Sequence, residues 1–430
     1  MDTKVLVLSI SAWNSSVGMD TWPILLEGRD PDHVANICLR GETPDSKACN
    51  HYFCISENKV IKSILKRSIQ TGSEKEAVIQ NEESNNDLNE HNTRYRRMKK
   101  HRSFATLMAR EILWMLGKWK SRELYDFITE FSPDVILYSM DGYIHFNRLC
   151  RYAKNISSAK SIGFFVDDNF TYRQSKKLGD RLFRCFQRSS LKKLARQTDA
   201  FWAITDMTKE EADDVFGINC TLLTKPLRSA PRYEEKKPQK PLKILYTGNL
   251  QIGRDRSLVK VVDALKTVNK REAAFVVDVY TKTVLDAAIN RELECDFCRI
   301  HPPIPKVEVL RRQKEADILL FLEDIDGPDA KTARLSFSTK ITDYLSAGKC
   351  ILAIGCPDTA PMQYFMKNQA AFVATSEREI EERLTEIAGN TDLLADYAKR
   401  ACDIGIKNHN KDDILRTVDT TIRKVLGEEA

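Results

Sequence analysis

The segment SFSTKITDYLSAGKCILAIG, residues 336–355, contains the pattern that decides the fold. Its first part predicts a helix that begins near Ser338, and its last part, from Cys350, is an apolar run that predicts a buried strand. Another apolar run, which ends at Phe321 or Leu322, predicts a strand before the helix. A strand, a loop, a helix and a second buried strand in this order are typical of a parallel sheet covered by helices.

The same alternation of apolar runs and helical patterns extends over most of the 430 residues. It predicts an α/β fold with two Rossmann-like domains, because each half of the chain contains its own series of strands and helices. The predicted strands are 4–10, 34–39, 51–55, 134–140, 161–167 and 199–205 in the first half, and 243–249, 273–281, 316–323, 349–355 and 370–375 in the second.

A charged segment with four prolines, PLRSAPRYEEKKPQKP at 226–241, separates the two halves. It has no helical or strand periodicity, which is typical of an interdomain linker. We therefore expect an N-terminal domain at 1–228, a linker at 229–241 and a C-terminal domain at 242–410. Residues 411–430 carry apolar side chains near helical spacing and predict a closing helix.

Composition excludes several classes of protein. Hydrophobic residues make up 42% and charged residues 30%, which excludes wholesale disorder and a membrane-spanning bundle. The net charge of +6 is too small for a dedicated nucleic-acid-binding protein, so we expect no nucleic-acid partner. The 11 cysteines, many of them in apolar runs, indicate reduced thiols in a cytoplasmic protein.

The predicted helix start near Ser338 offers a binding site for a phosphate group. Unpaired backbone N–H groups and the helix dipole favour an anion there. Ser338 and Thr339 could supply a cap and hydroxyl donors, and Lys340 a positive charge. Asp343, one turn further on, could accept hydrogen bonds from ribose hydroxyls. The alternative is an ordinary capped helix with an exposed lysine.

These residues resemble the donor-sugar signature of family 4 glycosyltransferases. The similar pattern is the acid and aromatic pair Asp343–Tyr344, then Ala347–Lys349, then a buried strand. YTGNLQIGRDRSLVKVVDAL at 246–265 resembles the strand, glycine-containing turn and helix that open the family's second domain. IPKVEVLRRQKEADILLFLED at 304–324 resembles its segment in which a helix precedes a strand. The resemblance extends over about 242–410, and the first half is similar only in strand pattern and length.

The resemblance implies the GT-B fold, in which two Rossmann-like domains face a cleft and the C-terminal helix crosses back to the first domain. It implies transfer of a sugar from a nucleotide-sugar donor, such as a UDP-sugar, to the hydroxyl of a saccharide or lipid-linked acceptor in polysaccharide, glycolipid or glycoconjugate synthesis. It further implies retention at the anomeric carbon. We expect no metal or other cofactor, because Arg254, Lys340 and the helix start near Ser338 would take the place of a divalent metal. The implied donor-binding residues are Gly248, Asn249, Arg254, Ser338, Thr339, Lys340 and Asp343. Arg254 and Lys340 would offset the charge of the leaving group.

The sequence departs from the family pattern at two positions. Of two glutamates that the family usually has with seven residues between them, the second falls on Asp343 and the first on Leu335. The family also has an arginine and a lysine that bind the phosphates. Their positions are occupied here by Asn249 and Arg254, so one of the two cations is missing. Arg256 and Lys340 are candidates for the missing cation. The candidates for the missing carboxylate are Glu323, Asp324, Asp326 and Asp329, among which the sequence does not choose.

The first domain is expected to bind the acceptor. Gly18, in the loop SAWNSSVGM, would let the backbone approach a ligand. The strand SIGFFVDDNF places two acids at its carboxyl end, and we expect Asp168 to act in catalysis and Asp167 to contact the acceptor. Adjacent side chains on an extended segment point to opposite faces, so only one would face the cleft. His145 is a third acceptor-side candidate. The alternatives are a structural turn for the loop that contains Gly18, a helix cap for the acids and a core position for His145.

Residues 71–103 do not fit the α/β pattern. The part up to residue 92 is rich in Glu, Asn, Ser and Gln, so we expect a mobile segment. RYRRMKKHR at 94–102 follows, and then FATLMAREILWMLGKWK at 104–120, with apolar residues at helical spacing. Residues 94–120 either lie on an anionic membrane on its inner face, near a lipid-linked acceptor, or cover the core of the first domain.

Two other functions remain open on the same fold. One is a nucleotide-sugar epimerase or a phosphorylase. The other is a non-catalytic partner subunit, because the family's first glutamate and one of its cations are missing. The chain has no strand-embedded G-x-G-x-x-G and no P-loop, so dinucleotide redox chemistry and nucleoside-triphosphate hydrolysis lack their usual loops.

Overall fold

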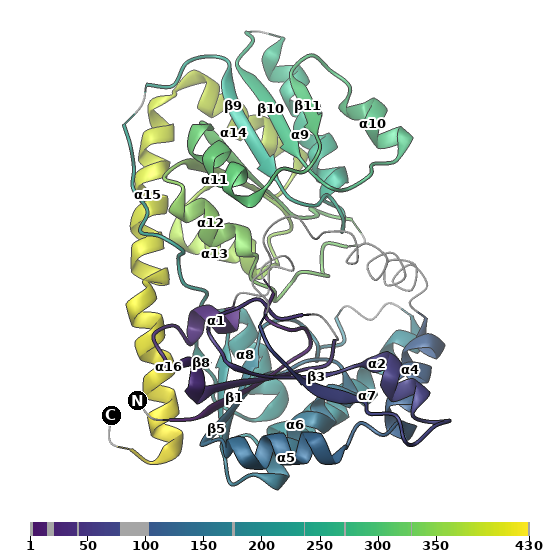
Figure 1. Ribbon diagram of the computed structural model, residues 1–430. Coiled ribbons are helices and arrows are strands. Elements are labelled where there is room, and N and C mark those ends of the chain that lie inside the picture. The colour runs from purple at the N-terminus through teal and green to yellow at the C-terminus, as the bar shows by residue number, and fades with distance from the viewer. Residues whose placement is uncertain are drawn as a thin grey trace. The chain divides into compact units, whose positions relative to one another are not determined.

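The structure is a computed structural model that describes most of the chain (Figure 1). The described residues are 3–14, 21–40, 43–77, 103–173, 177–235, 237–270, 272–327 and 329–428. The chain forms two compact units, which we describe separately. Unit 1 comprises Met1–Ile204, Thr208–Leu223 and Leu415–Ala430, and unit 2 comprises Thr205–Met207 and Thr224–Ile414.

Within its described residues, unit 1 contains an eight-stranded sheet in the order β4-β3-β2-β1-β5-β6-β7-β8. All neighbouring strands are parallel except β3 and β4, which are antiparallel. The strands are β1 Val5–Ser9, β2 Val34–Cys38, β3 His51–Ile55, β4 Gly72–Lys75, β5 Val135–Ser139, β6 Lys160–Phe165, β7 Ala200–Ala203 and β8 Thr221–Leu222. Every residue of β1 and β2 is buried, as expected for central strands covered on both faces.

The helices between these strands begin at capping residues or follow short loops. Ser103 caps α4 by accepting a hydrogen bond from the N–H of Thr106, and Ser121 caps α5 in the same way through the N–H of Leu124. The helical segments are α1 Thr21–Leu25, the short 3-10 helix Pro31–His33, α2 Glu57–Lys62, α4 Phe104–Leu116, α5 Arg122–Phe131, α6 Ile144–Ile156, α7 Leu178–Ala195, α8 Asp206–Phe216 and α16 Lys411–Leu426.

In the part of unit 2 that the structure describes, six parallel strands form a sheet in the order β11-β10-β9-β12-β13-β14. The strands are β9 Leu242–Thr247, β10 Phe275–Tyr280, β11 Cys298–His301, β12 Ile318–Leu322, β13 Cys350–Ile354 and β14 Phe372–Ala374. The helices are α9 Arg254–Asn269, α10 Ala287–Leu293, α11 Lys306–Glu315, α12 Thr339–Ser346, α13 Ala360–Asn368, α14 Glu377–Gly389 and α15 Asp392–His409. Apolar side chains of the central strands and of α9 form the core.

The last helix, α16, packs on unit 1 although it follows unit 2 in the chain. Thr421 accepts a hydrogen bond from the indole N–H of Trp202 at 3.1 Å, and Asp419 forms an ion pair with Arg29. The apolar side chains Val418 and Ile422 are buried. The C-terminal helix therefore returns to the first unit, as the sequence predicts.

Each predicted strand is present, and no end differs from the prediction by more than two residues. The short strands β4, β8 and β11 were not predicted, because their sequences GSEK, TL and CRIH contain no continuous apolar run. Part of the predicted mobile segment 71–103 is ordered, because β4 at its start pairs with β3, and the prediction is wrong for these residues. Residues 78–102 of the segment lie outside the described residues. Among the described helices, none combines the length and the apolar composition needed to cross a bilayer.

The topology of each sheet fixes where a ligand would bind. In unit 2 the chain proceeds from β9 to β10 on one side and from β12 to β13 on the other, so the strand order reverses between β9 and β12. In unit 1 the reversal lies between β1 and β5. Open parallel sheets bind ligands outside the carboxyl ends of the strands at such reversal points. The residues that follow these four strands are therefore the first candidates for a site.

Candidate functional site

Four of the predicted donor-binding residues meet at the reversal point of unit 2. Gly248 and Asn249 follow β9, Arg254 is the first residue of α9, and Lys340 lies in the first turn of α12. Glu323, which follows β12 directly, joins them through Arg254. We call Gly248, Asn249, Arg254, Glu323 and Lys340 the unit 2 site.

Lys340 lies against the backbone of Gly248 and the ring of Tyr246. Its ammonium group donates a hydrogen bond to the Tyr246 hydroxyl at 2.8 Å and lies 4.2 Å from the centre of that ring. A Cβ atom on Gly248 would lie 2.6 Å from Cε of Lys340, and the φ angle of Gly248 is +140°. A side chain at position 248 would therefore displace the lysine, so the glycine is required for this packing.

Arg254 forms a bidentate ion pair with Glu323. Its Nε lies 3.1 Å from Oε2 of Glu323 and its Nη2 lies 2.9 Å from Oε1, while its Nη1 donates to the side-chain oxygen of Asn249 at 3.0 Å. Both side chains of the pair are largely buried, with 13% of Arg254 and 5% of Glu323 exposed. Burial opposes the charge of Arg254, but the charge and hydrogen bonds of Glu323 outweigh it and raise the pKa of the guanidinium. Arg254 is therefore charged, and a carboxylate already balances that charge.

Lys340 differs from Arg254 in that its charge is not fixed. Burial and then the positive charge of Arg254 lower the pKa of Lys340, Glu323 partly opposes them, and the net result is a pKa of about 7. Near neutral pH the lysine is thus partly neutral. An anion bound beside it would favour the protonated form, so this site is able to take up a proton together with a phosphate group.

The structure places each of the four carboxylates that were candidates for the missing glutamate. Glu323 is the one that belongs to the unit 2 site. Asp324 and Asp329 both bind Arg256, at 2.9 and 3.2 Å, and Asp326 binds Lys260 at 2.9 Å. Arg256, the proposed substitute for the missing cation, is thus held by two acids of the loop after β12.

The remaining predicted donor residues lie on α12. Ser338 is the N-cap residue of this helix, as predicted, but its side chain makes no capping hydrogen bond. Thr339 is exposed and begins the helix. Asp343 lies one turn on, and its Oδ1 is 3.3 Å from Nε of Arg228, in the segment before β9. The structure therefore pairs Asp343 with a cation that the sequence did not identify, and its contact with a ribose stays a prediction.

Polar residues also gather at the carboxyl edge of the unit 1 sheet. Four neighbouring parallel strands, β1, β2, β5 and β6, each have a polar residue two positions after their last residue. In this strand order the residues are Ser11, Arg40, Asp141 and Asp167. Arg40 donates a hydrogen bond to the Ser11 hydroxyl at 3.1 Å. We call these four residues the unit 1 edge. Asp167, one of the predicted acceptor-side residues, is an exposed member of it.

Asp168 and His145 are held by structural contacts. The buried carboxylate of Asp168 accepts hydrogen bonds from the N–H and the hydroxyl of Thr171, at 2.9 and 2.5 Å, and so fixes the loop after β6. His145 is buried, its Nδ1 lies 2.9 Å from Oε2 of Glu111, and its ring stacks on Trp114. Gly18, another predicted acceptor-side residue, lies outside the described residues.

Asp141 is a candidate that the sequence analysis missed. Burial and then the negative charge of Asp167 raise its pKa, backbone hydrogen bonds and Arg40 partly oppose the increase, and the net result is a pKa of about 6. A carboxyl group with a raised pKa at the carboxyl end of a parallel strand is typical of a functional site. The available signal was its position, because the predicted strand 134–140 ends immediately before it.

Asp141→Asn is expected to stabilise unit 1 at neutral pH. Because the folded-state pKa of this acid is above its ordinary value of 3.8, the stability that depends on it is present at low pH and is lost as the pH rises through about 6. Ionised Asp141 therefore lowers the free energy of unfolding by on the order of 2 to 3 kcal/mol. Thermal unfolding of the variant should show a higher Tm than the wild type at about pH 7.5 and a flatter profile between about pH 4 and 6.

The control for this experiment is Asp180→Asn, which changes an exposed acid on α7 and should leave the profile unaltered. A Tm of Asp141→Asn below that of the wild type at about pH 7.5 would show that Asp141 is a structural carboxylate rather than one retained at a cost in stability.

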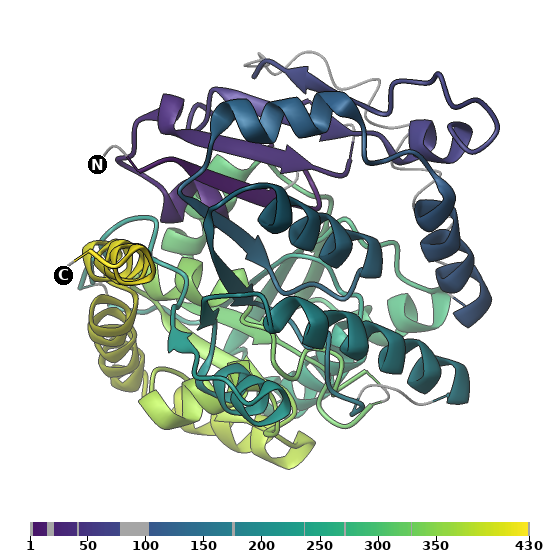
Figure 2. The same ribbon diagram turned by 90° about the horizontal axis from the view of Figure 1, so that it is seen from below.

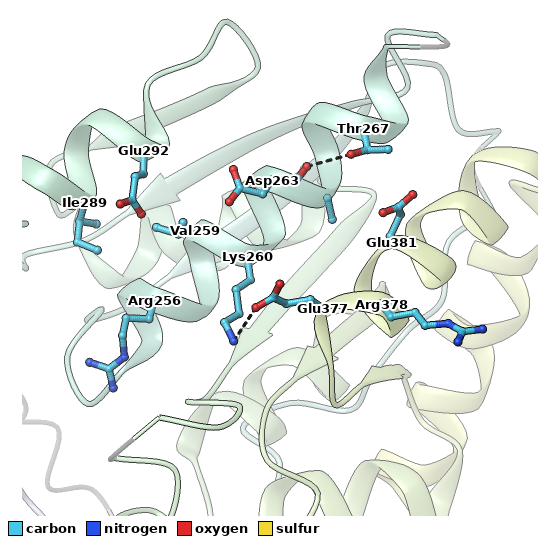
Figure 3. Close-up of a pocket in the computed structure, with 11 residues that line it drawn as sticks. Arg256, Val259, Lys260, Asp263, Thr267, Ile289, Glu292, Glu377, Arg378 and Glu381 are labelled. Atoms are coloured by element: carbon cyan, nitrogen blue, oxygen red, sulfur yellow. Dashed lines mark hydrogen bonds and ion pairs between the residues drawn. The ribbon is translucent and has the colours of Figure 1, made fainter.

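A separate hollow of about 500 Å³ lies on unit 2 along α9, α10 and α14 (Figure 3). Charged side chains of both signs line it, and Lys260 forms an ion pair with Glu377 at 2.9 Å across it. Because acids and bases there are interspersed, the hollow presents no single charge to a ligand, and we assign none to it.

Comparison with known proteins gives matches in structure but not in sequence. No family model and no curated protein matches the chain. The α,α-trehalose 6-phosphate synthase of Burkholderia multivorans matches with a TM-score of 0.58 at 9% identity, over 99% of this chain and 97% of that chain. WaaG, a glycosyltransferase involved in lipopolysaccharide biosynthesis, matches with a TM-score of 0.56 at 12% identity, over 98% of this chain and 100% of that chain.

Two further solved structures are similar to this chain. TarM matches with a TM-score of 0.53 at 10% identity over 69% of this chain, and the match spans only 57% of the TarM chain. A putative UDP-N-acetylglucosamine 2-epimerase from Listeria monocytogenes matches with a TM-score of 0.52 at 10% identity, over 100% of this chain and 98% of that chain. At these identities the comparisons show the fold, and they confirm the predicted two-domain GT-B fold.

Proposed function

We propose that this protein is a glycosyltransferase that moves a sugar from a nucleotide-sugar donor to a hydroxyl acceptor. The observation that carries the proposal is the unit 2 site, where Lys340, Arg254 and the start of α12 lie at the reversal point of a parallel sheet. The GT-B fold supports it, since WaaG, a glycosyltransferase, has the same fold.

In this proposal the donor diphosphate binds at the start of α12 and contacts Lys340. The bond between the sugar and the diphosphate breaks, a bond to the acceptor oxygen forms, and the acceptor proton passes to the leaving phosphate. Protonated Lys340, with the N–H groups of the first turn of α12, stabilises the charge that grows on that phosphate. Arg254 and Glu323 orient Asn249 and the loop after β9. Retention and independence of metal ions are part of the proposal.

The unit 1 edge is the proposed acceptor site. Asp141 and Asp167 would accept hydrogen bonds from acceptor hydroxyls, and Arg40 would limit the repulsion between the two acids. A role in polysaccharide or glycoconjugate synthesis, a lipid-linked or saccharide acceptor, and attachment to the inner face of a membrane through 94–120 belong to the same proposal.

A second candidate is a non-catalytic partner subunit that binds a nucleotide. The observation that favours it is that Glu323 neutralises Arg254 and that Asp324 and Asp329 neutralise Arg256, so that neither arginine lacks a counter-charge. A third candidate is an epimerase, because the putative UDP-N-acetylglucosamine 2-epimerase from Listeria monocytogenes has a similar fold.

Thermal unfolding in the presence of UDP or GDP tests the diphosphate site. A nucleotide at about 100 times its Kd should stabilise the protein by about 2.7 kcal/mol, and uridine, which lacks the diphosphate, should not. A panel of UDP-sugars with saccharide acceptors then separates the candidates by product: a new glycoside for the transferase, the epimeric sugar for the epimerase, and neither for the partner subunit. Absence of stabilisation by either nucleotide would reject the nucleotide-sugar function itself.

A further inference from the structure

Helices α7 and α4 of unit 1 expose an unusual number of large apolar side chains. Leu178, Leu182 and Phe186 on α7 are 75%, 47% and 50% exposed. They are four residues apart, so they form one stripe along the helix. On α4, Ile112, Met115 and Leu116 are 44%, 57% and 48% exposed.

Helices α4 and α7 meet near their N-terminal ends. They are in contact in unit 1, and a Cβ atom on Gly179 of α7 would lie 3.0 Å from Cβ of Phe104 at the start of α4. Figures 1 and 2 show the two helices as neighbours, with α4 in blue and α7 in teal. We call the six exposed apolar residues of α4 and α7 the apolar surface.

The charges of α7 are almost all positive. Its 18 residues contain five cations and one acid, Asp180. The guanidinium of Arg188 lies 5.2 Å from the ring of Tyr172, which is itself 41% exposed in the loop before α7. An apolar stripe bordered by cations and by an amphipathic aromatic residue is typical of a helix that lies in the interface of an anionic bilayer, because acyl chains take the apolar residues and headgroups the cations. The cations of α7 are Arg181, Arg184, Arg188, Lys192 and Lys193.

We propose that the apolar surface of α4 and α7 binds an anionic lipid bilayer. The surface is also close in the chain to the proposed acceptor site, since β6 leads through Asp167 and Tyr172 into α7. If the proposed function holds, the class of acceptor that such a surface serves is a lipid-linked hydroxyl compound, presented from the bilayer to the unit 1 edge. The proposed binding does not depend on the basic run at 94–102.

Co-sedimentation with vesicles tests the proposal on the full chain. The wild type should bind vesicles of phosphatidylcholine with about 30% phosphatidylglycerol at least about tenfold better than vesicles of phosphatidylcholine alone, and about 0.5 M salt should weaken this binding. The double variant Leu182→Asp/Phe186→Asp should lose at least about tenfold in binding, because it places two acids in the stripe. Both side chains are half exposed, so the variant should keep the Tm of the wild type.

Val307→Asp is the matched control, because it changes an 81% exposed apolar residue on α11 of unit 2 and should not alter vesicle binding. Unchanged binding by the double variant would overturn the proposal, and so would a wild type that binds neither vesicle. A dimer that the double variant abolishes, without vesicle binding, would assign the surface to a second copy of the chain instead. Stabilisation by UDP, measured on the same samples, is independent: a chain that binds vesicles but not UDP keeps the apolar surface and loses the proposed function.

Discussion

Lys340→Met is expected to weaken the binding of a UDP-sugar by about ten- to hundredfold near pH 6, where the lysine is protonated. The loss corresponds to a charged hydrogen bond to the diphosphate, about 1.5 to 3 kcal/mol. Methionine keeps the length of the side chain and its packing against Tyr246 and Gly248, so the loss reflects charge rather than a cavity. Calorimetry with UDP-glucose measures it, and Lys331→Met, which changes an exposed lysine of the loop before α12, is the control.

The pH profile of this binding makes the test specific to Lys340. The pKa of the free lysine is lowered to about 7, and a bound diphosphate would return it toward its usual value of 10.5. Binding therefore takes up a proton above about pH 7, and affinity for UDP-glucose should fall as the pH rises from there, by up to about tenfold per pH unit. The diphosphate of UDP-glucose is esterified at both ends and does not titrate in this range. Lys340→Met should show a flat profile, and a wild-type profile that is equally flat would place the diphosphate elsewhere.

The strands and the two Rossmann-like domains could be predicted because long apolar runs and helical spacing report burial directly, and the GT-B fold could be predicted from the resemblance of 242–410 to family 4 glycosyltransferases. The residues of the unit 2 site could be named from the same resemblance. Gly248, Arg254 and Lys340 lie at the ends of strands or the starts of helices, and topology brings such positions together. Glu323 could be included among four acids but not selected. Only the direction of its side chain after β12 decides that it meets Arg254.

The acceptor side shows where sequence reasoning fails. Strand β6 ends at Phe165, two residues earlier than the predicted end at Asp167, so the alternation of faces does not apply to the two acids that follow. Asp168 turns inward to Thr171, and Asp167 is the exposed acid. Asp141 was missed because its significance depends on Asp167 and Arg40, which are far away in the chain and meet it only through the order of the strands.

The helix at 104–120 illustrates a different limit. Periodicity predicts an amphipathic helix but cannot say which face is covered. In the structure Glu111 and Trp114 are buried against His145, so one face of α4 covers the core, while Ile112 and Leu116 on the other face are exposed. The two readings of this segment are therefore compatible, because each describes one face.

Glu323→Ala is expected to lower the free energy of unfolding of unit 2 by about 3 kcal/mol. The variant leaves Arg254 charged, mostly buried and without its carboxylate, and breaking a buried pair from one side typically costs about 3 to 5 kcal/mol. For a unit of this size that loss lowers Tm by about 6 to 12 °C. Thermal unfolding measures it, and Glu381→Ala, which changes an exposed acid on α14, should leave Tm within about 1 °C.

The double variant Arg254→Met/Glu323→Leu separates the charge from the packing. It removes both charges and keeps similar volumes, so it should recover most of the stability lost in Glu323→Ala. The affinity of Glu323→Gln for UDP-glucose then shows which role the carboxylate of the Arg254–Glu323 pair has. If Glu323 only balances Arg254, Glu323→Gln should bind UDP-glucose more tightly than the wild type, because it frees a positive charge beside the diphosphate. If the carboxylate instead contacts the donor sugar, in the role of the family's missing glutamate, the same variant should bind UDP normally and lose affinity only for the nucleotide sugar.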